Sequence, residues 1–264
     1  MKASEHTLSL IAQGLQSATT SRPLCQNKEV MSPTKTSSAS SPKNPSVWVV
    51  VPLYNEAEVI TEVITGLKVN FGNVLCVDDG SSDDSARLAE SAGARVLRHP
   101  LNLGQGAALQ TGFDYVSSQP LATHVLTFDA DGQHRVQDAV EMVELAQRKR
   151  ISVIYGSRFL DKRTRTGFKK RIVLQVAALM TRAFTGLRLT DAHNGLRVLS
   201  MEAIGKIQLE QNGMSHASEI VHQLAKSKFS WKEYPVEVLY TEYSKQKGQS
   251  LWNSVNILID LLVR

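Results

Sequence analysis

Residues 47–67, VWVVVPLYNEAEVITEVITGL, begin with a strand pattern and end with a helix pattern. The first seven residues are apolar and mostly β-branched, which is typical of a strand buried on both faces. From Val59 onward, apolar residues recur at the spacing of a helix. This stretch therefore predicts a buried strand that leads through a short polar loop into an amphipathic helix.

The same alternation of strand and helix continues to residue 157. Strand patterns occur at residues 73–79, 94–99, 123–129 and 151–157, and helix patterns lie between them at 81–93, 104–116 and 135–149. Strands that alternate with helices of this length pair in parallel through right-handed crossovers. The sequence therefore predicts an α/β fold with a mostly parallel central sheet and helices on both faces.

The rest of the chain sets the domain boundaries. Beyond Arg158 we expect an apolar helix at 172–184, a turn-rich segment at 185–195, a helix at 217–226 and an extended run at 230–240. Residues 1–45 are rich in Ser, Thr, Pro and Lys, so burial of apolar surface cannot offset the entropy of ordering them. We expect a disordered tail over 1–45, one domain over 46–248 and an amphipathic helix over 249–264. That helix either lies in a membrane interface or makes a core or dimer contact.

The composition narrows the class of protein. Only two cysteines occur, so a disulfide framework is excluded and a reducing cytoplasmic setting is favoured. No apolar stretch reaches the length of about eighteen residues that a membrane span requires. The formal net charge of +5 favours an anionic partner, such as a phosphate or a membrane surface. Because aromatic residues are hardly interleaved with the basic ones, we expect no nucleic-acid partner.

Polar residues cluster where the predicted strands end. In open α/β sheets, ligands bind outside the carboxyl ends of the strands. The first strand ends in PLYNE, the second in DDGS, the fourth in DAD and the fifth in GSR. The residues concerned are Pro52, Tyr54, Asn55, Glu56, Asp78, Asp79, Gly80, Ser81, Asp129, Asp131 and Arg158. Their positions predict a single crevice at one edge of the sheet.

Asp129 and Asp131 leave the fourth strand two positions apart, so both carboxylates can turn toward one point. Crowded carboxylates repel one another in a dry site, and a hard divalent cation such as Mg²⁺ or Mn²⁺ removes that repulsion. Gln133 can add a neutral oxygen ligand, and substrate phosphates can complete the shell. The alternative is a turn in which one of the two aspartates caps the next helix, from about Arg135. His134 is assigned no role.

Four other features each keep two interpretations. Asp78 and Asp79 either cap the following helix or accept hydrogen bonds from a nucleoside. Gly104, with its small neighbours, admits either a ligand or the adjacent strand at close range. Asp191 and Asn194 either line the acceptor side of the crevice or build a turn. A basic loop after Arg158 either is a solvated face or binds a second phosphate. The basic residues of this loop are Lys162, Arg163, Arg165, Lys169, Lys170 and Arg171.

Five motifs along the chain resemble those of one enzyme family. They are VVVPLYNEAEVI, VDDGSSDDS, NLGQGAALQTGF, FDADGQH and YGSRF. Their order and spacing resemble those of glycosyltransferase family 2, which has the GT-A fold. Within that family the set is similar to the branch of dolichol-phosphate mannose synthases and bacterial polyprenyl-phosphate glycosyltransferases. The resemblance covers roughly residues 46–240 and implies a single Rossmann-like GT-A domain.

The resemblance also implies a reaction and the residues that carry it. The reaction is an inverting, metal-dependent transfer of a sugar from a UDP- or GDP-linked donor to a polyprenyl phosphate. Many members of this branch carry C-terminal transmembrane helices, whereas residues 249–264 suit a helix in the membrane interface, so we expect a peripheral enzyme on the cytoplasmic face of the membrane. The residues implied for the nucleotide sugar are Pro52, Tyr54, Asn55, Glu56, Asp78, Asp79, Gly80, Ser81, Gly104 and Asp129. Those implied for Mg²⁺ or Mn²⁺ are Asp129, Asp131 and Gln133, and those for the acceptor phosphate are Arg158, Lys169 and Arg171.

Two other functions stay open. A glycosyltransferase acting on a saccharide hydroxyl in cell-surface polysaccharide assembly would need a carboxylate base, for which Asp191 is the candidate. A non-catalytic subunit could instead use the same fold to recruit a membrane partner. A polyprenyl phosphate needs no base, because a phosphate monoester is already largely dianionic at neutral pH. The predicted catalytic residues are Asp129, Asp131, Arg158 and Asp191.

Overall fold

The computed structural model describes residues 44–161, 168–213 and 215–239. The strands in these ranges are β1 (Val47–Leu53), β2 (Asn73–Asp78), β3 (Arg95–Arg98), β4 (His124–Thr127), β5 (Val153–Ser157), β6 (Arg197–Ser200) and β7 (Trp231–Pro235). The helices are α1 (Ile60–Lys68), α2 (Ser85–Ser91), α3 (Gln105–Ser117), α4 (Val136–Lys149), α5 (Phe168–Thr185), α6 (Met201–Ile204) and α7 (His216–Ala225).

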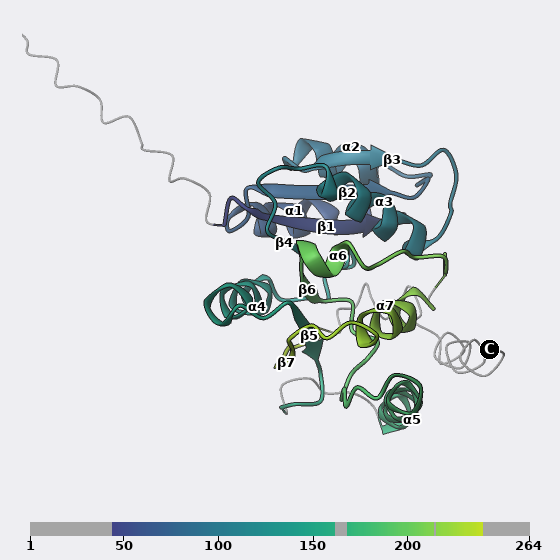
Figure 1. Cartoon of the computed structure of the whole chain (residues 1–264). Helices are drawn as coiled ribbons and strands as arrows, with labels where there is room; N and C mark the ends of the chain where they lie inside the picture. The colour runs from purple at the N-terminus through teal and green to yellow at the C-terminus, as the bar shows by residue number, and fades with distance from the viewer. Residues whose placement is uncertain (1–43, 162–167, 214, 240–264) are drawn as a thin grey trace, which may run out of the picture. The chain divides into compact units, whose positions relative to one another are not determined.

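The strands form one mixed sheet in the order β3-β2-β1-β4-β6-β5-β7 (Figure 1). Strand β1 pairs in parallel with both β2 and β4, β2 pairs in parallel with β3, and β5 pairs in parallel with β7. The predicted α/β fold with a mostly parallel sheet is therefore confirmed. Two pairings are not parallel, because β6 lies between β4 and β5 and runs antiparallel to both.

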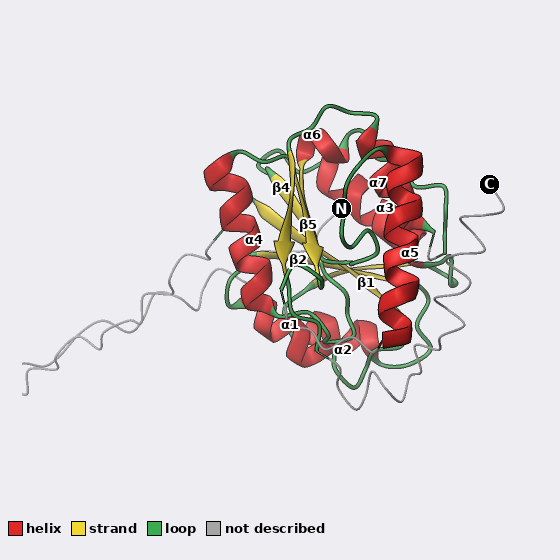
Figure 2. Ribbon diagram, turned by 90° about the horizontal axis from the view of Figure 1, so that it is seen from below, coloured by secondary structure: helices red, strands yellow, loops and turns green. Residues whose placement is uncertain are grey.

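The side chains of β1 alternate between two hydrophobic cores. Val49 and Val51 lie in the core formed with α1, α2 and α4, whereas Trp48 and Val50 lie in the core formed with α3, α6 and α7. Figure 2 shows the strands between these two groups of helices. A strand that buries both faces gains from every side chain, on the order of 1.5 kcal/mol or more for each valine. This explains why β1 reads as a continuous apolar run.

The strand order creates the crevice that the sequence predicts. From β1 the chain continues to β2 and β3 on one side, and it then returns to place β4 on the other side of β1. At such a reversal the loops after the two neighbouring strands diverge, which leaves a space at their carboxyl ends. Residues of the PLYNE segment, at the end of β1, and of the DAD segment, after β4, line this space together.

Several predicted segments fall outside the described residues. These are the tail apart from Asn44 and Pro45, the basic loop over 162–167 and the C-terminal helix over 249–264. Helix α5 begins at Phe168, so Lys169 and Arg171 lie in its first turn, but their side chains are also outside the described part. None of the helices in the described ranges is long and apolar enough to cross a membrane.

Candidate active site

A cavity of about 420 Å³ opens at the carboxyl ends of β1 and β4. It is bounded by the loops after these strands, the start of α3, the segment before β6 and the start of α7. The predicted site residues that line it are Pro52, Tyr54, Glu56, Asp79, Gly104, Asp129, Asp131, Gln133 and Arg158. The other described site residues, which do not line it, are Asn55, Asp78, Gly80, Ser81 and Asp191.

Asn55 and Ser81 join the loops that follow β1 and β2. The Asn55 backbone N–H donates to Ser81 Oγ at 2.9 Å, and the Ser82 N–H donates to Asn55 Oδ1 at 2.9 Å. Asn55 adopts a left-handed backbone (φ 53°), which asparagine tolerates better than most residues. These two residues therefore hold the β1–α1 loop against the β2–α2 loop.

Asp79 anchors the loop between β3 and α3. Its carboxylate accepts hydrogen bonds from the backbone N–H groups of Leu103 (2.9 Å) and Gly104 (2.7 Å), and it lies 2.7 Å from His99 Nδ1. The neighbouring Asp78 accepts from the Ser81 N–H at 3.3 Å. None of these bonds goes to the first turn of α2, so the capping interpretation is not supported. Asp79 lines the cavity, but most of the lone pairs of its carboxylate already accept hydrogen bonds.

The glycines at the start of α3 admit a distant loop rather than the adjacent strand. A Cβ on Gly104 would lie 2.1 Å from the carbonyl oxygen of Asn212, and one on Gly106 would lie 2.0 Å from that of Gln211. The Gly106 N–H donates to the Asn212 carbonyl at 2.9 Å. Close backbone packing, together with the φ of +101° at Gly104, requires glycine at the first position.

Asp129 is held by residues on both sides of the cavity. Its Oδ2 lies 2.9 Å from His134 Nε2, and its Oδ1 accepts from Gln105 Nε2 at 3.2 Å. Burial tends to raise the pKa of Asp129, but the bond and charge of His134 outweigh it and lower the pKa. Burial tends to lower the pKa of His134, and Asp129 in turn raises it. The two groups therefore form an ion pair, which is a contact that the sequence did not reveal.

Asp131 lies next to this pair, and its pKa is shifted in the direction opposite to that of Asp129. Burial raises its pKa to about 6, and the charges of Asp129 and Glu56 add to the effect. Its Oδ1 accepts from the backbone N–H of Gln133 at 3.0 Å. Helix α4 begins after Arg135, whose side chain makes no capping hydrogen bond, and the bonds of Asp129 and Asp131 go to Gln105, Gln133 and His134 instead. The capping alternative for the two aspartates is therefore wrong.

This donor set suits a hard divalent cation. Asp131 is crowded by two other carboxylates, and a cation would remove the repulsion that raises its pKa. Carboxylate and amide oxygens are the ligands that Mg²⁺ and Mn²⁺ prefer. Within the described ranges, no three acidic, histidine or cysteine side chains form a complete metal site. The residues therefore fit a cation that also takes ligands from a bound substrate.

Arg158 and Asp191 form a buried ion pair at the end of β5. The Asp191 carboxylate accepts from Arg158 Nε at 2.6 Å, from Nη2 at 2.8 Å and from the Arg158 backbone N–H at 3.1 Å. Burial tends to raise the pKa of Asp191, but Arg158 lowers it below its ordinary range. A carboxylate with three such donors is a weak base, which argues against the base that a hydroxyl acceptor would need.

Several residues that the sequence did not assign to the site also line the cavity. His193, Arg197 and His216 line the cavity, and burial lowers the pKa of His193 to about 4 and also lowers that of His216. Three buried polar atoms of the described residues lack a hydrogen-bond partner, and all belong to residues that line the cavity. These atoms are His134 Nδ1, Asn194 Nδ2 and Arg197 Nε. Buried polar atoms without partners are rare in proteins and indicate a place for ligand or water.

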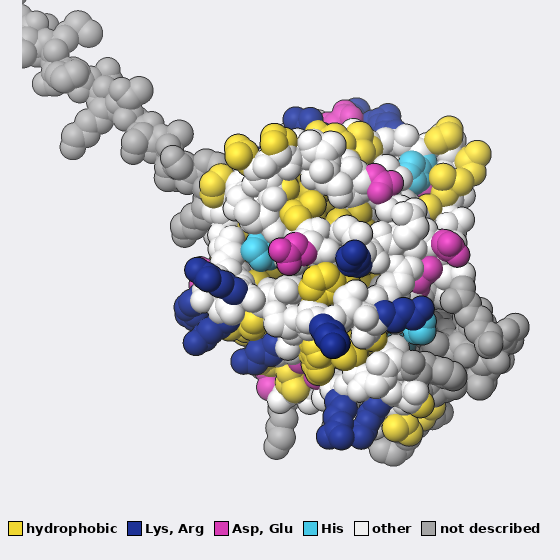
Figure 3. Space-filling model, viewed as in Figure 1, with side chains coloured by type: hydrophobic (Ala, Val, Ile, Leu, Met, Phe, Trp, Pro, Cys, Tyr) yellow, Lys and Arg dark blue, Asp and Glu magenta, His cyan; other side chains and the backbone are white. Residues whose placement is uncertain are grey.

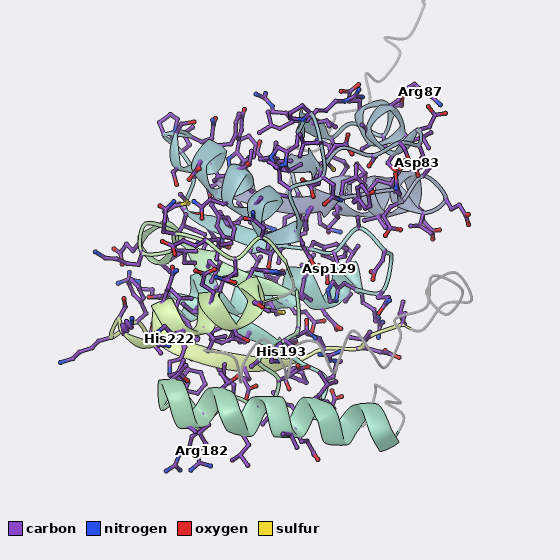
Figure 4. All side chains as sticks on the ribbon, turned by 90° about the vertical axis from the view of Figure 1, so that its right-hand side faces the viewer. Asp83, Arg87, Asp129, Arg182, His193 and His222 are labelled. Atoms are coloured by element: carbon purple, nitrogen blue, oxygen red, sulfur yellow. The ribbon has the colours of Figure 1, made fainter. Side chains whose placement is uncertain are left out.

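The figures show how the site lies in the molecule. In Figure 4, His193 lies below Asp129, on the side nearer α5. Figure 3 shows most of the Lys and Arg side chains of its face over the lower half, where Figure 1 places α4, β5 and α5. The excess of positive charge is thus not confined to the predicted basic loop.

The sequence profile of Glycosyl transferase family 2 matches residues 48–208, which is more than half of the chain. The chain belongs to glycosyltransferase family 2. As predicted, the protein is a glycosyltransferase with a GT-A fold, and most of the predicted site residues line one cavity at the carboxyl ends of the strands.

Relatives of this family 2 glycosyltransferase include two archaeal proteins. An uncharacterized protein of Methanocaldococcus jannaschii is 34% identical, with 83% of this chain and 91% of that protein covered. The UDP-N-acetylglucosamine–dolichyl-phosphate N-acetylglucosaminyltransferase of Methanococcus voltae is 26% identical, with 82% and 95% covered. Among solved structures, glucosyl-3-phosphoglycerate synthase from Mycobacterium tuberculosis, in complex with Mg²⁺ and UDP, has the same fold. Its TM-score is 0.63 at 17% identity, with 83% of this chain and 79% of that chain covered.

Proposed function

We propose that this family 2 glycosyltransferase transfers a sugar from a nucleotide-sugar donor to a polyprenyl phosphate, with inversion at the anomeric carbon. The observation that carries the proposal is a single cavity lined by Asp129 and Asp131 at the end of β4 and by Arg158 at the end of β5. The carboxylates suit a cation on a leaving diphosphate, and the guanidinium suits an anionic acceptor beside it. The name of the Methanococcus voltae relative, a dolichyl-phosphate transferase, supports this acceptor class.

The donor would occupy the part of the cavity near β1. Pro52, Tyr54, Glu56 and Asp79 would contact the nucleoside, and the Tyr54 side chain is 46% exposed, so its ring is accessible. Gly104 would lie against the diphosphate. Asn55, Asp78, Gly80 and Ser81 would act indirectly, by fixing the two loops that carry these contacts.

A divalent cation would be held by Asp131 and Gln133, with Asp129 beside them. When bound, Mg²⁺ or Mn²⁺ supplies a Lewis acid that stabilises the charge developing on the leaving diphosphate. His134 donates its Nε2–H to Asp129 and so fixes the direction in which that carboxylate points. Asp129 would then stay ionised at neutral pH, because the bond and charge of His134 outweigh the effect of its burial.

The acceptor would enter from the Arg158 side. A phosphate monoester is largely dianionic at neutral pH, so its oxygen can attack without a general base. Arg158 would orient that oxygen and reduce its repulsion from the diphosphate, and Lys169 and Arg171 at the start of α5 would assist. Attack from the side opposite the leaving group inverts the anomeric carbon. A saccharide hydroxyl is less well supported as acceptor, because its candidate base, Asp191, is paired with Arg158.

The proposed location follows from the acceptor. A polyprenyl phosphate lies in a membrane, so the enzyme would work as a peripheral protein on the cytoplasmic face, where nucleotide sugars are available. Residues 249–264, with their apolar residues on one helical side, would provide the contact. A non-catalytic recruiting subunit is less well supported, because such a subunit has no need of a crowded carboxylate cluster inside a cavity.

The test is an incubation of the purified protein with membranes and radiolabelled UDP- and GDP-sugars. We expect a lipid product that is labile to mild acid, formed with Mn²⁺ and lost with a chelator. Asp131→Asn should abolish its formation, and Asp114→Asn, which changes an exposed aspartate on α3, should not. Transfer to a saccharide in place of lipid would refute the proposed acceptor, and nucleotide-sugar turnover that ignores the chelator would refute the cation.

A further inference from the structure

Glu233 does not line the cavity, but hydrogen bonds link it through Asp191 to Arg158, which does. It belongs to β7, at the edge of the sheet, and its Oε1 accepts three hydrogen bonds from the segment before β6. The donors are the Thr190 backbone N–H (2.7 Å), the Thr190 hydroxyl (2.9 Å) and the Asp191 backbone N–H (3.1 Å). One carboxylate oxygen thus fixes both residues of the Thr190–Asp191 corner.

The same corner is tied to β5. Thr190 Oγ1 lies 2.6 Å from Ser157 Oγ, and Ser157 is the last residue of β5. Strands β5 and β7 pair in parallel, with Ser157 opposite Pro235, so the corner spans the ends of two neighbouring strands. Because both attachment points belong to a sheet, the position of Asp191 is set by rigid elements rather than by a loop alone.

The corner in turn directs Arg158. Asp191 binds the guanidinium through Nε and Nη2, and the guanidinium carbon lies 5.9 Å from the centre of the Phe159 ring. A two-point bond fixes the plane of a guanidinium as well as its position, which a single contact would not do. Arg158 lines the cavity, whereas Asp191 and Glu233 do not.

We propose that Glu233 is a positioning residue for anion binding: through the Thr190–Asp191 corner, it holds the Arg158 guanidinium toward the cavity. This inference rests on the proposed function, in which Arg158 binds the acceptor phosphate. Glu233 and Asp191 carry no proton in the reaction and touch no substrate. Their effect is to keep Arg158 in one orientation before the phosphate arrives, so that less side-chain entropy is lost on binding.

The inference is tested with Glu233→Ala, Glu233→Gln and the matched control Glu237→Gln. Glu237 pairs with Arg135 at 2.7 Å, away from the Thr190–Asp191 corner. We expect Glu233→Ala to raise KM for a short-chain isoprenyl phosphate about tenfold, with little change in KM for the donor. Glu233→Gln keeps an oxygen that can accept the same three bonds, so it should stay within about threefold of the wild type. Glu237→Gln should match the wild type.

A binding measurement separates positioning from general damage. Calorimetric titration with the isoprenyl phosphate alone should show the same weakening for Glu233→Ala, while titration with UDP or GDP and Mn²⁺ stays unchanged. Equal affinity of wild type and Glu233→Ala for the isoprenyl phosphate would overturn the inference, as would a parallel loss of donor and acceptor binding. If the wild type binds no isoprenyl phosphate, the proposed function fails first, and that result is distinct from equal binding by the two proteins.

Discussion

Asp131→Asn is expected to make the metal-free protein more stable at neutral pH. Burial raises the pKa of Asp131 from 3.8 to about 6, with the charge of Asp129 as the next cause. At neutral pH the folded protein therefore holds a carboxylate in a place where the charged form is disfavoured. An asparagine has nearly the same shape, keeps an oxygen for the Gln133 N–H and carries no charge.

The size of the effect follows from the pKa. A rise from 3.8 to about 6 corresponds to about 3 kcal/mol, at roughly 1.36 kcal/mol for each pKa unit. Because the carboxyl is only half-buried, solvent screening reduces this to about 1–2 kcal/mol. For a chain of this size, roughly 2–4 °C in Tm accompanies each kcal/mol, so the variant should melt about 2–8 °C higher at pH 7.

The direction in which the free energy of unfolding changes with pH follows from the same shift in pKa. Because the folded pKa of Asp131 is the higher one, the unfolded chain loses its proton first as pH rises. The free energy of unfolding of the wild type should therefore fall between about pH 4 and pH 6 from this group, and stay lower above that range. Asp131→Asn should lack this fall, whereas Asp114→Asn, an exposed control on α3, should keep it.

The assay is thermal unfolding of the three proteins across this pH range, first with a chelator and then with excess Mn²⁺. Mn²⁺ binds only the folded state of the proposed site, so it should raise Tm of the wild type and of Asp114→Asn. It should not raise Tm of Asp131→Asn. The reasoning is refuted if the metal-free variant is no more stable than the wild type at pH 7, or if Mn²⁺ stabilises all three alike.

Three further predictions concern the neighbouring groups. Gly195→Ala places a Cβ 2.3 Å from Asp129 Oδ2, so the rate of sugar transfer should fall at least about a hundredfold. The control Gly66→Ala in α1 should be tolerated, and equal transfer rates for the two variants would contradict the prediction. His134→Phe should lower Tm more at about pH 6 than at about pH 9, because the pKa of His134 is raised and its ion pair with Asp129 is lost as pH rises. An equal decrease in Tm at both pH values would exclude the ion pair. Asp191→Asn should raise KM for the phosphate acceptor without removing the acidic limb of the pH–rate profile, and loss of that limb would identify a base.

The outline of the fold could be predicted because it depends on local patterns. The apolar run of β1 and the helical spacing after Val59 are properties of short segments, and their alternation leaves few topologies. The insertion of β6 between β4 and β5 could not be predicted. Its four residues follow a turn-rich segment, and nothing in their pattern specifies which strands they join.

The residues of the candidate site could likewise be predicted only in part. Asp129, Asp131 and Gln133 were found because they follow a buried strand directly, and Arg158 was found because it ends another. Asn55 and Ser81 carry the same signal, yet they bond to each other and do not line the cavity, because a residue at a strand end can point to either side of the loop. A strand-end position predicts nearness to a site but not contact with it.

The sequence by itself determined the α/β class, the end of the sheet at which the candidate site lies, and the family. These depend on spacing and residue type within short stretches, which folding does not alter. Only the tertiary structure decided that His134 pairs with Asp129, that Asp191 pairs with Arg158 and bonds to Glu233, and that Gly104 and Gly106 admit the 211–212 backbone. Except for the local His134–Asp129 pair, these contacts join residues far apart in the chain. Their formation depends on strand order and on the directions of buried side chains, and neither is recorded in the hydrophobic pattern of any one segment.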